Sequence, residues 1–374
     1  MCDMCDQQVK EQEVSDNHPG TGTRVVSVNE AAGLILPHDI TEIIPGEFKG
    51  RAFKKGHVVQ EKDIEHLRRI GKEHLYLLEI KDDEIHENDA AIAMAIALAG
   101  KGVKMEGEPS EGKVNLIAGT DGLLKVKHRA LIDFNMLGEV MCATLHNNYV
   151  VKKGQVLAGT RAIPLVVKKS IVKEAVRIAE HAGFILSVTP MRKPKAGLVI
   201  TGNEVYHGKI KDAFEPVITA KIKKFDGEIA GVHFAPDNAK IIEDRIRELI
   251  NAGADLIITT GGMSVDPDDV TRFAIRNLGV DELHYGSPVL PGAMFLVAYL
   301  QNSELRTQNT DNNYIPILGI PACGMYASIT VFDLILPRVL AGERIGRREI
   351  AELGHGGLCL KCETCRYPVC PFGK

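Results

Sequence analysis

The chain lacks an excess of basic residues and lacks any apolar run long enough to cross a bilayer. Its 45 Lys and Arg are outnumbered by 49 Asp and Glu, which gives a formal net charge of −4. Nucleic-acid-binding proteins carry the opposite balance, because their cations neutralise phosphates. The longest apolar stretches, such as Ala90–Ala99, are far shorter than the roughly 20 residues of a membrane-spanning helix. We therefore expect neither nucleic acid nor a membrane as a partner.

A signal-peptide pattern is also missing. The first residues are polar and acidic, without the basic start and apolar core of a secretory leader. Residues 1–24 show no periodicity, and we interpret them as a flexible arm. No repeat of fixed period is visible, and no Ser–His–Asp or Cys–His arrangement can be identified from spacing. These absences favour a cytoplasmic protein.

The length and the composition are those of a multidomain globular protein. A chain of 374 residues is long enough for two or three cores, and 45% of the residues are hydrophobic and 25% charged. Changes of pattern along the chain predict four parts. They are the arm at 1–24, an N-terminal region at 25–190, a main domain at 196–342 and a Cys-rich tail at 354–374.

The N-terminal region mixes short strand-like runs with two helices. A helix is expected at Glu61–Arg69, and a second at about Ser170–Ala182, where apolar residues recur on one face. We interpret the region as a smaller α/β unit.

The main domain alternates buried strands with amphipathic helices. Apolar runs occupy 198–200, 229–234, 256–259 and 315–320, and between the second and third runs Ile242, Ile246, Leu249 and Ile250 form one stripe. Such alternation is typical of βαβ units. The expected fold is a three-layer α/β/α domain with a mainly parallel sheet.

Two loops that follow predicted strands carry candidate ligand-binding residues. In open parallel sheets, ligands bind at the carboxyl ends of the strands. The first loop is Thr201–Val205, which combines a glycine with hydroxyl, amide and carboxylate groups. The second is Thr259–Thr271, in which two adjacent glycines precede a helix start and suit an anion such as phosphate.

The acidic residues of the second loop allow two interpretations. Asp266, Asp268 and Asp269 could cap the following helix, or they could hold a magnesium ion that bridges carboxylates and phosphate oxygens. The sequence leaves both open.

In their order along the chain, these loops resemble the molybdopterin-binding domain shared by molybdopterin adenylyltransferases and molybdopterin molybdenumtransferases. The resemblance covers about Ala196–Gly342. It depends on five matching segments in the family's order, which together are more specific than any one of them. The matching segments are Thr201–Val205, Pro236–Asn238, Thr259–Asp269, Pro291-Gly292 and Pro321–Gly324.

The resemblance implies a ligand, a set of site residues and partners. The ligand would be molybdopterin, in free or adenylated form, with Mg²⁺, and molybdate would be the second substrate. A homo-oligomer, and contact with a molybdoenzyme or another cofactor-biosynthesis protein, are also implied. The implied catalytic residues are Glu204, Asp237 and Asp269. The implied ligand-binding residues are Thr201, Gly202, Asn203, Thr260, Gly261, Gly262, Ser264, Asp266, Pro321, Cys323 and Gly324.

The sequence departs from the family pattern at three positions of the site. Asn203 replaces an aspartate, Asp266 replaces a glycine, and Ala322-Cys323-Gly324 replaces Gly-Asn-Pro, which introduces a thiol that can contact a soft metal or sulfur. Residues 27–36 resemble the opening of a molybdenumtransferase, but the Ser-Ala-Met-Asp-Gly-Tyr-Ala signature expected afterwards is absent.

Four cysteines cluster in the tail as Cys359-x2-Cys362-x2-Cys365-x4-Cys370. Thiolates at this spacing suit zinc or an iron–sulfur cluster. The spacing differs from the bacterial ferredoxin pattern by one extra residue before the last cysteine. We predict a metal-binding tail.

Two functions remain open. The first is a molybdenumtransferase-like enzyme that inserts molybdenum into adenylated molybdopterin. The second is a non-enzymatic molybdopterin carrier or sensor with a metal- or redox-responsive tail. Asn203 and the missing signature favour the second, whereas Glu204, Asp237 and Asp269 favour the first.

Overall fold

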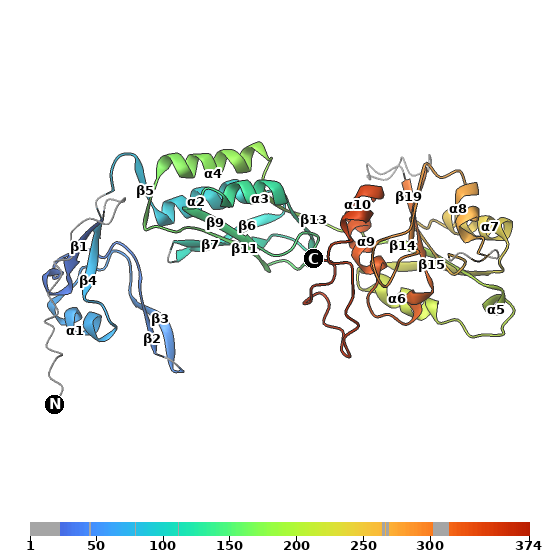
Figure 1. Cartoon of the computed structure of the whole chain (residues 1–374), viewed down its shortest axis with the longest axis horizontal. Helices are drawn as coiled ribbons and strands as arrows, with labels where there is room; N and C mark the ends of the chain where they lie inside the picture. Colours follow the sequence, from blue (N-terminus) through green and yellow to red (C-terminus); the bar gives the residue numbers. More distant parts are fainter. Residues whose placement is uncertain are drawn as a thin grey trace, which may run out of the picture. The chain divides into compact units, whose positions relative to one another are not determined.

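A computed structural model of the chain describes residues 23–44, 46–78, 80–110, 112–263, 266, 269–301 and 314–374. The chain forms two compact units (Figure 1). The first is built from residues 1–117, 127–144 and 156–186, and the second from residues 118–126, 145–155 and 187–374. Most of the predicted arm, residues 1–22, lies outside the described residues, and strand β1 (Thr23–Ser27) begins within the predicted segment.

The second unit contains a six-stranded sheet with the order β15-β14-β16-β19-β18-β17. The first four strands are parallel, and β18 and β17 complete the sheet in antiparallel pairing. The bounds are β14 (Lys195–Thr201), β15 (Glu228–Ala235), β16 (Leu256–Thr260), β17 (Glu282–Tyr285), β18 (Leu296–Gln301) and β19 (Tyr314–Ile320). The apolar runs predicted as strands are all confirmed.

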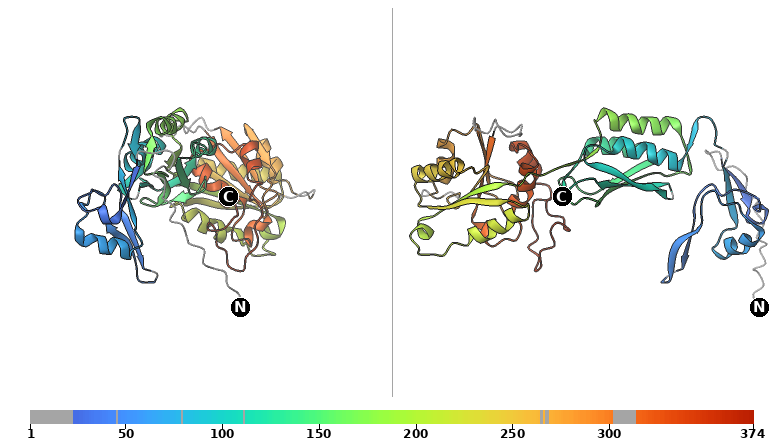
Figure 2. Two further views of the ribbon diagram at one scale, coloured as in Figure 1. Left: turned by 60° about the vertical axis from the view of Figure 1, so that its left-hand side comes forward. Right: turned by 180° about the vertical axis from the view of Figure 1, so that it is seen from behind.

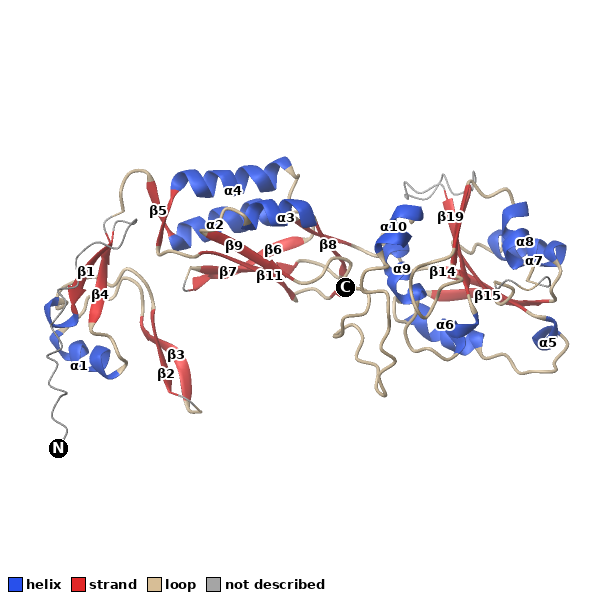
Figure 3. Ribbon diagram, in the orientation of Figure 1, coloured by secondary structure: helices blue, strands red, loops and turns tan. Residues whose placement is uncertain are grey.

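Helices cover both faces of this sheet (Figure 3). Leu198 and Ile200 of β14 pack into one core with α6 (Phe214–Lys223), α9 (Val331–Leu340) and α10 (Arg347–Glu352), whereas Val199 packs into the other with α7 (Ala239–Asn251) and α8 (Thr271–Asn277). Side chains of a strand alternate between its faces, so a strand covered on both sides must be apolar throughout. The three-layer α/β/α prediction is confirmed.

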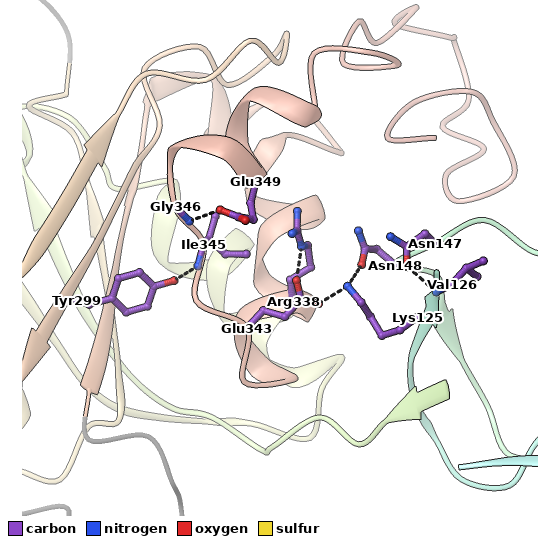
Figure 4. Close-up of polar contacts among 10 residues, drawn as sticks. All are labelled: Lys125, Val126, Asn147, Asn148, Tyr299, Arg338, Glu343, Ile345, Gly346 and Glu349. Atoms are coloured by element: carbon purple, nitrogen blue, oxygen red, sulfur yellow. Dashed lines mark hydrogen bonds and ion pairs between the residues drawn. The ribbon is translucent and has the colours of Figure 1, made fainter. Parts of the chain in front are cut away.

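Three further strands belong to a small sheet, β10-β8-β13, comprising Val150–Val151, Gly122–Val126 and Leu186–Thr189. An ion-pair network joins β8 to the segment after α9 (Figure 4). Lys125 Nζ donates to Glu343 Oε1 at 2.6 Å, and Arg338 Nε donates to Glu343 Oε2 at 2.9 Å. Arg338 is only 6% exposed, so the carboxylate of Glu343 compensates a charge that the fold has removed from water.

The first unit contains a four-stranded sheet, β6-β7-β11-β9, against which helices α2, α3 and α4 pack (Figure 2). The strands are Val103–Ser110, Lys113–Ala118, Val156–Ala162 and Val140–Thr144, and the helices are α2 (Glu87–Leu98), α3 (His128–Asn135) and α4 (Lys169–His181). A two-stranded sheet pairs β12 (Val166–Lys168) with β5 (Glu84–His86). The predicted second helix is confirmed as α4.

The N-terminal part of this unit has its own core, made by nine buried residues between Val26 and Leu75. It contains β1 paired with β4 (His74–Leu78), β2 (Ile40–Ile44) paired with β3 (Phe48–Phe53), and α1. Helix α1 spans Glu61–Arg69, as predicted. Among the described residues, every helix is too short or too polar to traverse a bilayer.

Candidate functional site

The predicted loops meet at the carboxyl ends of β14 and β16, where successive strands are added to opposite sides of the sheet. Strands β14 and β16 are neighbours, but the chain passes from β14 to the edge strand β15 before it returns to β16 and continues to β19 on the other side. Crevices of open α/β sheets form at the carboxyl ends of such strands. A cavity of about 780 Å³ lies here, a size typical of small-molecule sites.

Most of the predicted site residues line this cavity. They are Thr201, Gly202, Glu204, Asp237, Gly261, Gly262, Asp266, Asp269, Pro321 and Cys323. Three others do not line it: Asn203 and Gly324 adjoin lining residues, and Thr260 is fully buried. Ser264 lies outside the described residues. Tertiary structure thus brings together five sequence segments that the resemblance selected one by one.

Thr201 ties the two principal loops to each other. Its hydroxyl donates to the Thr260 carbonyl at 2.9 Å and lies 3.0 Å from the Thr271 hydroxyl. Thr201 is 4% exposed, and Thr260 and Thr271 are fully buried. These contacts stabilise the buried Thr201 hydroxyl, because leaving a buried polar group without a hydrogen bond costs about 1–3 kcal/mol. Thr201 therefore positions the loops, in addition to forming part of the cavity wall.

Gly261 and Gly262 are required by this packing. Both have a positive φ, 82° and 57°, which side-chain-bearing residues rarely adopt. A Cβ on Gly261 would lie 2.4 Å from the Thr201 carbonyl oxygen, and one on Gly262 would lie 2.3 Å from Thr271 Oγ1. The glycines therefore let this loop fold directly against Thr201 and Thr271.

The far side of the same loop is anchored by Met263. Tyr285 donates its hydroxyl to the Met263 carbonyl at 2.5 Å, and the Met263 side chain is 2% exposed. Gly319 of β19 makes room for it, since a Cβ there would lie 2.5 Å from Met263 Cε. The Gly261–Met263 segment is consequently fixed at both ends before any ligand binds.

Asn203 and Asp237 hold each other across the end of the sheet. The Asn203 N–H donates to Asp237 Oδ2 at 2.9 Å, and the Asp237 N–H donates to Asn203 Oδ1 at 3.2 Å. Asn203 begins the short helix α5 (Asn203–Tyr206), and Asn238 caps α7 through its side chain. Asparagine keeps the acceptor that an aspartate would supply and removes a negative charge beside Asp237.

Other carboxylates of the cavity also have local structural roles. The Asp266 N–H donates to Asp269 Oδ2 at 3.3 Å. Asp212 accepts from the N–H groups of Phe214 and Glu215 at 2.9 and 2.8 Å, and so caps α6. The Asp269 contact joins two residues of the loop, and Val270, the N-cap of α8, makes no side-chain capping hydrogen bond. Among the described residues, the structure therefore shows no capping of α8 by Asp266 or Asp269.

The charge of the cavity is predominantly negative. Among the described residues, five carboxylates line it, from Glu204, Asp212, Asp237, Asp266 and Asp269, against two cations, Lys211 and Lys361. A phosphate placed among these carboxylates would be repelled unless a cation stood between them.

The described residues do not provide a ready-made magnesium site. No three His, Cys, Asp or Glu side chains among them converge in an arrangement that could hold a metal ion. Magnesium often takes only one or two carboxylates and completes its shell with phosphate oxygens and water. The donor set therefore fits magnesium only when a phosphate ligand accompanies it.

Several lining residues were not predicted. Lys211 and Asp212 follow α5, and Leu358, Cys359 and Lys361 come from the tail. The tail reaches the cavity through backbone pairing, because Leu290 N–H donates to the Gly357 carbonyl and Cys359 N–H donates to the Leu290 carbonyl, each at 2.8 Å. No local pattern in the sequence signals this pairing, although the Pro291-Gly292 turn beside it was predicted to lie near the site.

The cysteines are distributed around one end of the cavity. Cys323 begins the turn after β19 within a 3₁₀ helix (Ala322–Met325), and burial raises the pKa of its thiol. Cys359 and Cys370 are half-buried, whereas Cys362 and Cys365 are exposed. The structure therefore places the four tail cysteines in one region without gathering them around one point.

Comparison with known families identifies two segments. Residues 197–341 match the family described as "Probable molybdopterin binding domain". Residues 25–79 match a family described as "Domain of unknown function (DUF8806)".

Curated relatives match only part of the chain. A CinA-like protein of Mycobacterium avium (strain 104) is 37% identical over 92 residues, which cover 23% of this chain and 21% of that protein. A CinA-like protein of Mycobacterium tuberculosis (strain CDC 1551 / Oshkosh) is 34% identical over 93 residues, 24% of this chain and 22% of that protein. The chain thus spans about a fifth of the length of these curated relatives.

Solved structures with a similar arrangement include the tungsten cofactor synthesizing protein MoaB from Pyrococcus furiosus. It is 17% identical and covers 39% of this chain and 90% of its own, with a TM-score of 0.31. A molybdopterin biosynthesis moea protein from Pyrococcus horikosii is 15% identical and covers 86% of this chain and 75% of its own, with a TM-score of 0.30.

Proposed function

We propose that the domain at residues 197–341, a member of the molybdopterin-binding domain family, binds molybdopterin or its adenylated form in the cavity at the carboxyl ends of β14, β15 and β16. We further propose that the protein acts in molybdenum cofactor biosynthesis as a molybdenumtransferase-like enzyme. Molybdate would be its second substrate, and the nucleotide would leave when the metal is inserted.

The observation that carries this proposal is the preformed loop at Gly261–Met263. Thr201, Thr271 and Tyr285 fix it by hydrogen bonds, and its glycines tolerate no side chain. A preformed loop that lines a cavity at a strand end suits a phosphate-bearing ligand, because little ordering entropy is lost on binding. The cavity volume of about 780 Å³ is sufficient for a pterin.

The carboxylates would serve the phosphate end of the ligand. Asp237 is oriented by the Asn203 N–H, and Asp269 by its contact with the Asp266 N–H. Held in this way, they would accept protons or share a magnesium ion that enters with the ligand phosphate. Glu204 lines the same wall.

Binding can be tested by calorimetric titration of the full-length protein with molybdopterin under anaerobic conditions. The wild-type protein should bind with a stoichiometry of one per chain. Asp269→Asn keeps an acceptor for the Asp266 N–H and removes a charge, so it should retain binding and lose turnover with adenylated molybdopterin, magnesium and molybdate. Asp244→Asn, at an exposed ion pair on α7, is the matched control. Absence of binding by the folded wild-type protein would refute the proposal.

A carrier or sensor without catalysis is the second candidate. The favouring observation is that both Asp237 and Asp269 accept backbone hydrogen bonds, which gives each carboxylate a structural role in its loop. The same incubation separates the two functions. Release of AMP that depends on molybdate supports the enzyme, and tight binding of the adenylated ligand without AMP release supports the carrier.

A further inference from the structure

A second cavity, of about 410 Å³, adjoins the first and is lined by five cysteines. They are Cys323, Cys359, Cys362, Cys365 and Cys370. The two cavities share a wall made of Pro291, Cys323, Leu358, Cys359 and Lys361. Six of the chain's eight cysteines fall on described residues, and only Cys142 lies away from this cavity.

The segment that carries the tail cysteines is a loop with both ends fixed. At one end, Cys359 N–H donates to the Leu290 carbonyl at 2.8 Å, and at the other, Gly373 N–H donates to the Gly356 carbonyl at 2.9 Å. Phe372 is 3% exposed and packs edge-on against Tyr367 with ring centroids 6.4 Å apart. Metal binding would therefore have to order only the middle of the loop.

The part of this loop that carries Cys362 and Cys365 is exposed to solvent. Leu360 and Val369 are 69% and 77% exposed, and Cys362 and Cys365 are exposed as well. Cys359 and Cys370 are half-buried against the core of the second unit. Two thiols are thus packed at the ends of the loop, and two more lie on its exposed part, so metal binding would require Cys362 and Cys365 to move toward Cys359 and Cys370.

We propose that Cys359, Cys362, Cys365 and Cys370 bind a thiophilic metal centre in this second cavity, directly beside the candidate pterin cavity. Four thiolates are the donor set of tetrahedral zinc and of iron–sulfur clusters. Lys361 and Arg366 line the same cavity and offset the negative charge that four thiolates leave on the centre. Cys323 stays outside the ligand set, at the shared wall.

The first test measures metal bound to the full chain in reducing, anaerobic buffer. One arm titrates Zn²⁺, with Co²⁺ as a spectroscopic probe of thiolate ligation, and the other supplies Fe²⁺ and Fe³⁺ in equal amounts together with sulfide. The wild-type protein should retain either about one zinc ion or a full cluster per chain. The arm that yields a stable stoichiometric product identifies the centre.

Two variants make the result specific. Cys362→Ser with Cys365→Ser changes only exposed thiols and should abolish stoichiometric binding while the thermal unfolding temperature of the metal-free protein stays unchanged. Cys142→Ala removes a buried thiol of β9 (Val140–Thr144) and should leave metal binding intact. Equal metal contents in the wild-type protein and the double variant, in both arms, would overturn the proposal.

Proteolysis supplies a second readout that needs no pterin. Lys361 and Arg366 are exposed in the same loop, so trypsin should cut after them in the metal-free protein. A bound centre should slow both cleavages at least tenfold in the wild-type protein and leave them unchanged in the double variant. Because neither test uses molybdopterin, the metal site can fail or succeed independently of the proposed function.

Discussion

The hydroxyl groups of Thr201 and Thr271 lie 3.0 Å apart, although 70 residues separate them in the chain. Thr201 ends β14 and Thr271 begins α8. Their contact fixes the glycine loop between β16 and α8 against the loop that follows β14. The shape of the candidate site therefore depends on one buried hydrogen-bonded pair as well as on the residues that face the cavity.

We predict that Thr271→Val weakens both stability and ligand binding. Valine has a similar shape but leaves the Thr201 hydroxyl with only the Thr260 carbonyl as a partner. The free energy of unfolding should fall by about 1–2 kcal/mol, as measured by urea denaturation. Thr271→Ser retains the hydroxyl, so its free energy of unfolding should fall by less than that of Thr271→Val. Equal losses in the two variants would show that the hydrogen bond is unimportant.

Gly262→Ala should cost more stability than Gly279→Ala. Both glycines have a positive φ, 57° and 82°, so each substitution carries a backbone penalty of about 1 kcal/mol. At Gly279 a Cβ meets nothing within 4 Å, whereas at Gly262 it would lie 2.3 Å from Thr271 Oγ1. The additional loss at Gly262 should be about 1–3 kcal/mol.

The same pair of variants also tests the site. Titration with molybdopterin should give weaker binding for Gly262→Ala and unchanged binding for Gly279→Ala. An unchanged dissociation constant in a folded Gly262→Ala protein would place the ligand elsewhere.

Glu343→Gln should destabilise the second unit. Its carboxylate accepts from Lys125 and from the buried Arg338 (Figure 4). Loss of the charge leaves Arg338 without its anionic partner, which should cost about 2 kcal/mol in chemical denaturation. Glu352→Gln disrupts the exposed pair with Arg348 and should change stability by less than about 0.5 kcal/mol. Similar effects of the two substitutions would contradict this assignment.

The Glu84–Lys168 pair should make stability depend on pH at the acidic end. The hydrogen bond from Lys168 lowers the pKa of Glu84, which is 3% exposed. The contribution of the ion pair to the free energy of unfolding is complete above the unfolded-state pKa of Glu84, about 4.3. It is lost as the pH falls through the lower folded-state pKa. Glu84→Gln should therefore be less stable than the wild-type protein at pH 7, by about 1 kcal/mol.

That difference should shrink as the pH drops below about 4, since the carboxyl group of the unfolded wild-type chain then binds a proton that the folded chain, with its lower pKa, binds only at a more acidic pH. Urea denaturation at several pH values measures it. Glu174→Gln, at an exposed pair with Arg177, is the control. A difference between Glu84→Gln and the wild-type protein that stays constant from pH 7 to pH 3 would argue against the lowered pKa.

Local patterns were sufficient to predict the layers of the second unit. Strand β16 is buried at every position because both faces are covered, and its first three residues are apolar; the stripe of Ile242, Ile246 and Leu249 repeats at helical spacing. Both signals arise from neighbours within one element. The same reason explains why α1 and α4 were predicted close to their observed bounds.

The convergence of the loops was partly predictable, because strand ends of a parallel sheet share one edge. What each residue does there was not. The sequence suggested that the adjacent glycines suit an anion, and the structure adds that the missing side chain of Gly262 leaves room for Thr271. In the sequence, Asn203 stands where the family has an aspartate. In the structure, its side-chain oxygen accepts a hydrogen bond from the Asp237 N–H.

The sequence by itself determined the alternation of strands and helices, the positions of the glycine and acidic loops, and the clustering of thiols in the tail. These depend on spacing along the chain. Only the tertiary structure decided that the tail pairs with Leu290 and that Cys323 and Cys359 separate two neighbouring cavities. Such contacts join residues far apart in sequence through backbone hydrogen bonds, which leave no mark on the side-chain pattern.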